Sequence, residues 1–238
     1  MVVLSREAFD AIEFDAAYTG DHRAAAEQMT RLADTGTQSP AMPRSEAYLR
    51  AGEQWLLADD AAAAANGFMR AIADGGTASI DPRAPLARAL FMLGRNDEAE
   101  ALVRDLGLAA PRDARLCDLM AELLVERSDL PRALAWATAG VDLCLGGQPE
   151  PVSRDTLPLE PGTGQAIIRE DTAPGGQPLT RATGPGGGRP ALPSGDRTEL
   201  RLLLTLRYRI RNDLGLPEDA YDELLDELLS ETGGSAAD

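Results

Sequence analysis

The side chains that carry most enzyme chemistry are scarce in this chain. Its 238 residues include one histidine, His22, and two cysteines, Cys117 and Cys144. His22 falls in an expected turn, away from any cysteine or carboxylate cluster at ligand spacing, so we expect a surface residue rather than a metal ligand or catalytic base. The cysteines lack C-x-x-C spacing and are expected to be buried thiols. No metal or other cofactor is predicted.

Two glycine-rich runs, at 162–164 and 184–188, raise the question of phosphate binding. A phosphate-binding loop needs a strand before it and a helix after it, and a Walker sequence needs a lysine. Neither flank is expected, and all 23 basic residues are arginine. Calcium-loop and G-x-S-x-G patterns are also missing, and no carboxylate pair stands out. We predict that the protein is not an enzyme; the alternative, a long lid over a helical scaffold, rests only on the length of residues 146–196.

The charge balance limits the kinds of partner that the protein can bind. There are 39 acidic against 23 basic residues, for a net charge of -16, which repels nucleic acid and anionic membranes. The first residues lack the pattern of a signal peptide, and no apolar run reaches membrane-spanning length. We therefore expect a cytoplasmic protein whose partner is another protein or a peptide. The lack of lysine indicates a high-GC genome, and we expect a bacterial source.

The hydrophobic pattern predicts an all-α fold. Aromatic residues make up only 4% of the chain, while alanine and leucine dominate, which suits closely packed helices. Up to about residue 145, apolar residues recur at intervals of three and four, which predicts helices joined in pairs by short turns. The pairs are expected at 5–19 with 23–33, at 44–73 with a break at 59–60, at 85–106 with a break at 94–96, and at 112–143 with a break at 128–129.

The pairs repeat. Ala64, Ala99 and Ala133 lie at the same place in successive pairs, 35 and then 34 residues apart. A fixed period of this size indicates a stack of repeated helix pairs. A helical bundle of another topology is the alternative.

The second pair carries the most specific motif. Tyr48-x-x-Ala-Gly52-x-x-Trp55 is followed by Ala64-x-x-x-Phe68, and this resembles the tetratricopeptide repeat signature. Small residues at the position of Gly52 allow the second helix of a pair to lie against the first. The first pair departs from the signature, which fits a terminal cap or a wrong register. The first pair differs in having Glu13 where a small residue is expected. The third pair repeats the motif through Leu86, Ala87, Leu90, Gly94, Val103 and Pro111. The fourth pair repeats it through Met120, Ala121, Leu124, Asp129 and Ala137.

The resemblance implies a right-handed superhelix whose first helices line a concave groove for a peptide or a partner helix. Arg88 and Arg115 suit a carboxylate of a bound peptide, or they pair with Glu53 or Glu122. Phe91 is either an anchor in the groove or a core residue. The residues that the resemblance places in the groove are Glu53, Leu56, Leu57, Arg88, Phe91, Arg115, Asp118, Glu122 and Glu126.

The composition changes after the repeats, which are assigned to residues 1–145. Residues 146–196 contain 11 glycines and 9 prolines. Because they have too few large apolar side chains to form a core, they are predicted to be a disordered or extended insert. A small hairpin at 156–169 is the one alternative there.

A last helix pair is expected at 197–231, packed on the repeats and followed by a flexible tail at 232–238. Pro217 is expected to be the first residue of its second helix. The first helix is basic and the second acidic, so Arg207 and Arg211 either pair internally or remain free for an acidic partner. The run from Arg207 to Asp219 is similar to the closing helices of the helical repeat domain in bacterial antibiotic-pathway regulators. This gives the alternative function, a regulatory or sensor module beside a separate DNA-binding or signalling protein.

Overall fold

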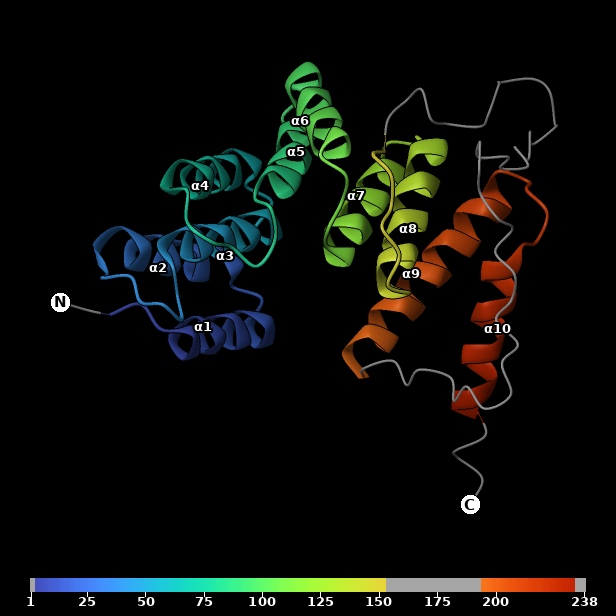
Figure 1. The fold of residues 1–238 in the computed structure, drawn as a ribbon. Helices are drawn as coiled ribbons and strands as arrows, with labels where there is room; N and C mark the ends of the chain where they lie inside the picture. Colours follow the sequence, from blue (N-terminus) through green and yellow to red (C-terminus); the bar gives the residue numbers. More distant parts are fainter. Residues whose placement is uncertain (1–2, 153–193, 234–238) are drawn as a thin grey trace.

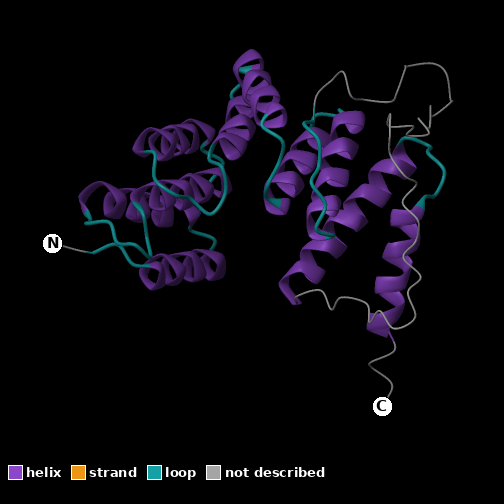
Figure 2. Ribbon diagram, viewed as in Figure 1, coloured by secondary structure: helices purple, strands orange, loops and turns teal. Residues whose placement is uncertain are grey.

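The described part of the protein is built from helices. The computed structural model describes residues 3–152 and 194–233, and within them ten helices and no strand are present (Figure 2). This confirms the all-α prediction. The helices are α1 (Arg6–Thr19), α2 (His22–Thr35), α3 (Arg44–Leu57), α4 (Ala61–Asp74), α5 (Arg83–Met92), α6 (Asn96–Leu108), α7 (Ala114–Glu126), α8 (Leu130–Cys144), α9 (Ser194–Asp213) and α10 (Ala220–Gly233).

Consecutive helices pack in pairs and the pairs stack along the chain. Within a pair, α3 packs on α4, α5 on α6 and α7 on α8, while α2 packs on α3, α4 on α5 and α8 on α9. Between the third and fourth pairs, α7 packs on α5. The helices follow an arch in Figure 1, with α1 to α4 on one side, α5 and α6 at the top, and α7 to α10 on the other side.

The same turn closes the first helix of three successive pairs. Asp59, Gly94 and Ser128, spaced by 35 and 34 residues, all adopt the left-handed conformation, with φ of 57°, 74° and 58°. In each case the next amide N–H donates to a carbonyl five residues back, as Asp60 does to Trp55 at 2.9 Å. The period found in the sequence is therefore a period of the backbone.

Small residues allow the helices of a pair to approach closely. A Cβ on Gly52 would lie 2.5 Å from the Phe68 ring, so the ring of α4 occupies the space that a side chain would need. Ala64, Ala99 and Ala133, which defined the period, are all fully buried. The predicted role of small residues in pair packing is confirmed at Gly52.

The first pair is more open than the others. Phe14 and Tyr18 on α1 are 77% and 87% exposed. A pocket of about 610 Å³ lies between α1 and α2 and is lined largely by small residues such as Ala8, Ala11 and Ala24. This end of the stack is therefore less completely packed than the pairs that follow.

The described start of the predicted insert returns to the repeats. The Val152 amide donates to the Gly107 carbonyl at 3.0 Å, and a Cβ on Gly107 would collide with the Val152 carbonyl. Val152 is buried beside α6, so the described start of the insert is anchored to the helices at this residue. The rest of the insert, including the possible hairpin at 156–169, lies outside the described residues, as does the tail from residue 234.

The last pair is joined by buried ion pairs. Arg207 and Arg211 are 4% and 9% exposed and pair with Asp219 and Asp222. The alternative that these arginines remain free is therefore wrong. The expected helix start at Pro217 is also wrong: α10 begins at Ala220, because the Asp219 carboxylate accepts the Tyr221 amide N–H at 3.1 Å and caps the helix.

Arg207 connects three helices. Its Nε donates to Thr138 Oγ1 on α8 at 3.0 Å, and its guanidinium lies 4.4 Å from the centre of the Tyr221 ring. The Tyr221 hydroxyl donates to Asp142 on α8 at 2.5 Å. Burial, together with this hydrogen bond, raises the pKa of Tyr221 to about 12. The C-terminal pair is thus fixed to the fourth pair by a polar network as well as by leucine packing.

Candidate functional site

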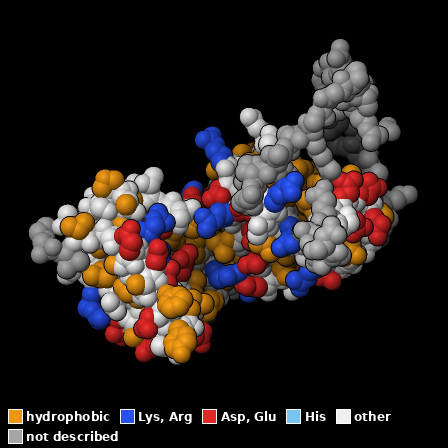
Figure 3. Space-filling model, turned by 90° about the horizontal axis from the view of Figure 1, so that it is seen from below, with side chains coloured by type: hydrophobic (Ala, Val, Ile, Leu, Met, Phe, Trp, Pro, Cys, Tyr) orange, Lys and Arg blue, Asp and Glu red, His pale blue; other side chains and the backbone are white. Residues whose placement is uncertain are grey.

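The first helices of the four repeat pairs share one charged face. In α3 and α7 the residues of this face recur at three and four residue intervals, so they lie on one side of each helix. Seen from below, the molecule is hollowed between its two halves, and acidic and basic side chains lie next to each other there (Figure 3). We call this face the concave surface; its residues are Asp10 and Glu13 on α1, Arg50, Glu53 and Leu57 on α3, Arg88 on α5, and Arg115, Asp118, Glu122 and Glu126 on α7.

Arg50 joins α1 to α3. Its Nη2 lies 2.6 Å from Asp10 Oδ1, and its Nε lies 2.7 Å from Glu13 Oε1. The Arg50 side chain is 9% exposed, so its charge is held largely out of water by two carboxylates. Glu13, which replaces the small residue of the repeat signature, therefore serves as an ion-pair partner of Arg50 in the next repeat.

Arg88 joins α5 to α7 in a similar way. Its Nη2 lies 2.9 Å from Glu126 Oε1 and 3.7 Å from Glu122 Oε2. Of the two partners expected from the sequence, Arg88 thus pairs with Glu122, and Glu126 is a closer one. An arginine held by two carboxylates is poorly suited to bind a further carboxylate of a peptide.

Glu53 lies between these two assemblies. Its side chain is exposed to solvent, yet protein surrounds it on the concave side. This crowding, followed by the charges of Glu13 and Glu46, raises the pKa of Glu53 to about 7. Arg50 and Arg115 act in the opposite direction, so Arg115 on α7 is near enough to influence α3.

Asp118 shows a shift in the same direction. The side chain is half-buried, and desolvation, followed by the charge of Glu122, raises its pKa. Arg115, one turn earlier on α7, is exposed. The middle of the concave surface therefore holds carboxylates that its own arginines do not fully neutralise.

The apolar residues expected in the groove divide into two kinds. Leu57 is 61% exposed and lies one turn beyond Glu53, whereas Leu56 is half-buried against the core. Phe91 is 8% exposed, and the Arg127 guanidinium lies 4.8 Å from its ring centre. Of the two interpretations of Phe91, the structure favours the core residue.

Three residues of the concave surface were missed from the sequence. Asp10, Glu13 and Arg50 form the ion pairs between α1 and α3, over separations of 40 and 37 residues. The available signal was the position of Arg50, which is one turn before Glu53 and therefore on the same face of the helix.

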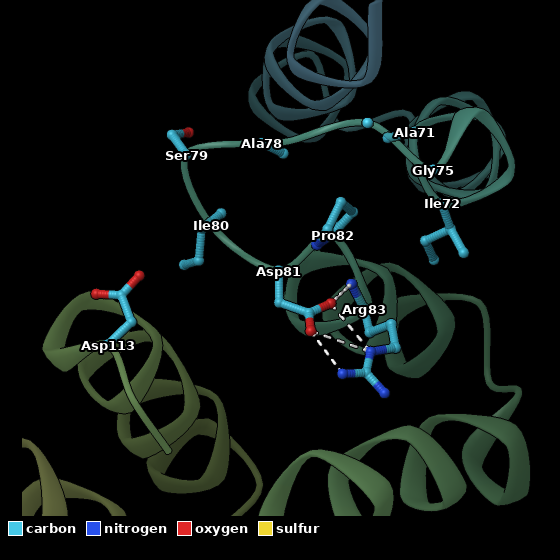
Figure 4. Close-up of a pocket in the computed structure, with 11 residues that line it drawn as sticks. Ala71, Ile72, Gly75, Ala78, Ser79, Ile80, Asp81, Pro82, Arg83 and Asp113 are labelled. Carbon is cyan, nitrogen blue, oxygen red and sulfur yellow. Dashed lines mark hydrogen bonds and ion pairs between the residues drawn. The ribbon is translucent and has the colours of Figure 1, made fainter. Parts of the chain in front are cut away.

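A separate pocket of about 340 Å³ lies where the α4–α5 connection passes near the start of α7 (Figure 4). Its polar side chains include Asp81, Arg83 and Asp113. Asp81 and Arg83 form a two-pronged ion pair, with Arg83 Nη2 2.6 Å from Asp81 Oδ2. The charges of Asp81 and Arg83 therefore neutralise each other.

The residues considered for metal or thiol chemistry are one histidine and two cysteines. His22 Nδ1 lies 2.9 Å from Gln54 Oε1. Burial, followed by the nearby Asp113, raises the pKa of Cys117 to about 12, which keeps its thiol protonated, and both cysteines are unbridged. Over residues 3–152 and 194–233, no three potential ligands of histidine, cysteine or carboxylate type form a metal-binding group.

Comparison with known families identifies the repeats. A family model described as Tetratricopeptide repeat matches residues 56–123, from the end of α3 into α7. Residues 56–123 are therefore of the tetratricopeptide repeat type. The matched span includes the left-handed turns at Asp59 and Gly94 and the complete third pair. Searches of curated proteins and of solved structures gave no match.

Tetratricopeptide repeats generally mediate interactions between proteins and form a scaffold without catalytic residues. In the part of the chain that the structure describes, no helix is long and apolar enough to cross a membrane.

The substitution Glu53→Gln should remove a pH dependence of stability. The pKa of Glu53 is raised in the folded protein, so wild-type stability falls as pH rises from about 4.5 to 7, where the folded carboxyl loses its proton. We expect the variant to be more stable at pH 8 by about 1 kcal/mol, since solvent contact reduces the effect, and equal to wild type at pH 4.5. Urea unfolding at both pH values measures the difference. A variant that is no more stable at pH 8 would contradict the assignment.

Proposed function

We propose that this protein binds a segment of a partner protein along its concave surface. The observation that carries this proposal is the shared face of α1, α3, α5 and α7, where charged side chains meet across repeats that belong to a protein-binding type. Support also comes from Leu57, an apolar residue that is exposed on this face. Arg115 is exposed there too, and it forms no ion pair with other described residues. In this proposal Arg88, Asp118 and Glu122 also line the surface that the partner covers, whereas Phe91 belongs to the core.

Comparative capture tests the proposal. Immobilised wild-type protein and the variant Leu57→Asp/Arg115→Glu are exposed to an extract of the source organism, and bound proteins are quantified by mass spectrometry. We expect a stoichiometric partner of the wild type to be lost from the variant. Arg115 is preferable to Arg88 for charge reversal, because reversal at Arg88 would place three carboxylates together and disturb folding.

A matched variant controls for general surface effects. Met69→Asp/Arg104→Glu changes one exposed apolar residue and one exposed arginine on second helices, outside the concave surface. Its partner recovery should equal that of the wild type. If both variants retain the partner equally, binding occurs elsewhere and the proposal fails.

The alternative regulatory module depends on the run from Arg207 to Asp219. In the structure Arg207, Arg211 and Asp219 all take part in packing α9 against α10. This use accounts for three of the six charges in the run without a partner.

A further inference from the structure

The ion pairs of the concave surface indicate which chemistry it accommodates. Arg50 and Arg88 each lie between two carboxylates of the neighbouring first helix. In both cases a guanidinium projects from one first helix and is held by acidic residues spaced three or four apart on the other. The chain thus twice uses the same arrangement, a guanidinium enclosed by carboxylates, to join adjacent repeats.

Between these two assemblies lie two carboxylates that have no guanidinium paired with them. Glu53 on α3 and Asp118 on α7 form no ion pair or hydrogen bond with other described residues. Arg115 is the third arginine of the surface, and among the described residues no ion pair joins it to Glu53 or to Asp118. The two carboxylates therefore have a deficit of positive charge in a place that solvent reaches.

The neighbouring apolar residue suits the same ligand. Leu57 lies one turn from Glu53 on the same face of α3 and is 61% exposed. An arginine side chain combines a cationic head with an aliphatic stem that packs on apolar surface. Leu57 beside Glu53 provides contacts for both parts.

We propose that the concave surface selects a partner segment rich in arginine, whose guanidinium groups pair with Glu53 and with Asp118. This inference rests on the proposed function and adds the chemical class of the partner. It reverses the expectation from the sequence, in which Arg88 and Arg115 would capture a carboxylate of the peptide. Nucleic acid is disfavoured by the same carboxylates, because they repel phosphate.

Calorimetric titration with synthetic peptides tests the inference. The probe is an alanine-based peptide with four arginines, and the matched peptides carry citrulline, which is uncharged and of the same shape, or glutamate at those positions. The arginine peptide should bind wild-type protein and weaken as salt is raised, and the citrulline peptide should not bind. Equal binding of the arginine and citrulline peptides, or no binding of either, would overturn the inference.

Paired variants separate the site from general charge attraction. Glu53→Gln/Asp118→Asn should bind the arginine peptide about tenfold more weakly. Glu223→Gln/Asp226→Asn makes the same change in net charge at exposed positions of α10 and should bind as the wild type does. An equal loss in both variants would show that only the overall charge of the protein attracts the peptide.

The glutamate peptide distinguishes failure of the inference from failure of the proposed function. If it binds and is lost on Arg115→Glu, the concave surface binds segments of the opposite charge; the inference is then wrong and the proposed function stands. The proposed function fails on the separate result that captured partners ignore substitutions on the concave surface.

Discussion

Replacing Arg207 with alanine is expected to release α10 from the fold, at a cost of about 3 kcal/mol. The guanidinium is 4% exposed and lies close to Asp219 and Asp222, at 2.6 and 3.6 Å, and its removal leaves Asp222, itself 7% exposed, with Arg211 as its remaining cation. It also removes the cation stacked on Tyr221. Because α10 contacts the rest of the described protein mainly through α9, the loss should be local.

Hydrogen exchange followed by mass spectrometry measures this effect. Amides of α9 and α10 should exchange faster in the variant, while those of α3 to α6 keep their protection. Arg209→Ala, at an exposed position of the same helix, is the control and should exchange as the wild type does. Unchanged protection of α10 in Arg207→Ala would show that leucine packing alone holds the last pair.

Replacing Gly52 with valine should destabilise the second pair by about 3 kcal/mol, because the added side chain has no space. The first added carbon alone would lie 2.5 Å from the Phe68 ring, which is fully buried and cannot turn away without displacing α4. Chemical denaturation measures the change in the free energy of unfolding.

A double variant tests the mechanism. Phe68→Leu in the Gly52→Val background should cost less than the two single changes combined, because the smaller side chain vacates the space that valine enters. Additive costs would mean that the two residues do not compete for one volume. Asn66→Ala, exposed on α4, is the control for a change in that helix.

Local signals in the sequence were sufficient to predict the repeats. Asp59, Gly94 and Ser128 interrupt the apolar pattern at the spacing at which the structure forms its left-handed turns. Turns and helix periods depend on residues within a few positions of each other, so they can be read from one sequence. The helix start at Pro217 failed for a local reason as well, since Asp219 is the stronger cap.

The concave surface was less predictable, because its contacts join distant positions. Arg50 meets Asp10 and Glu13 across 40 and 37 residues, and periodicity gives the face of a helix but not the partner opposite it. Phe91 is covered by Arg127 of the next pair, a contact that depends on how the pairs stack. The choice between paired and free arginines at Arg88 was left open for the same reason.

The joint between the third and fourth pairs has a mechanical consequence. Here α7 packs on α5, and this contact joins the top of the arch to its second side. On the concave side the joint is spanned by Arg88 with Glu122 and Glu126, and beside the second helices by the hydrogen bond from Val152 to Gly107. Both contacts hold the third pair to the fourth, so the loss of either would loosen this joint of the arch.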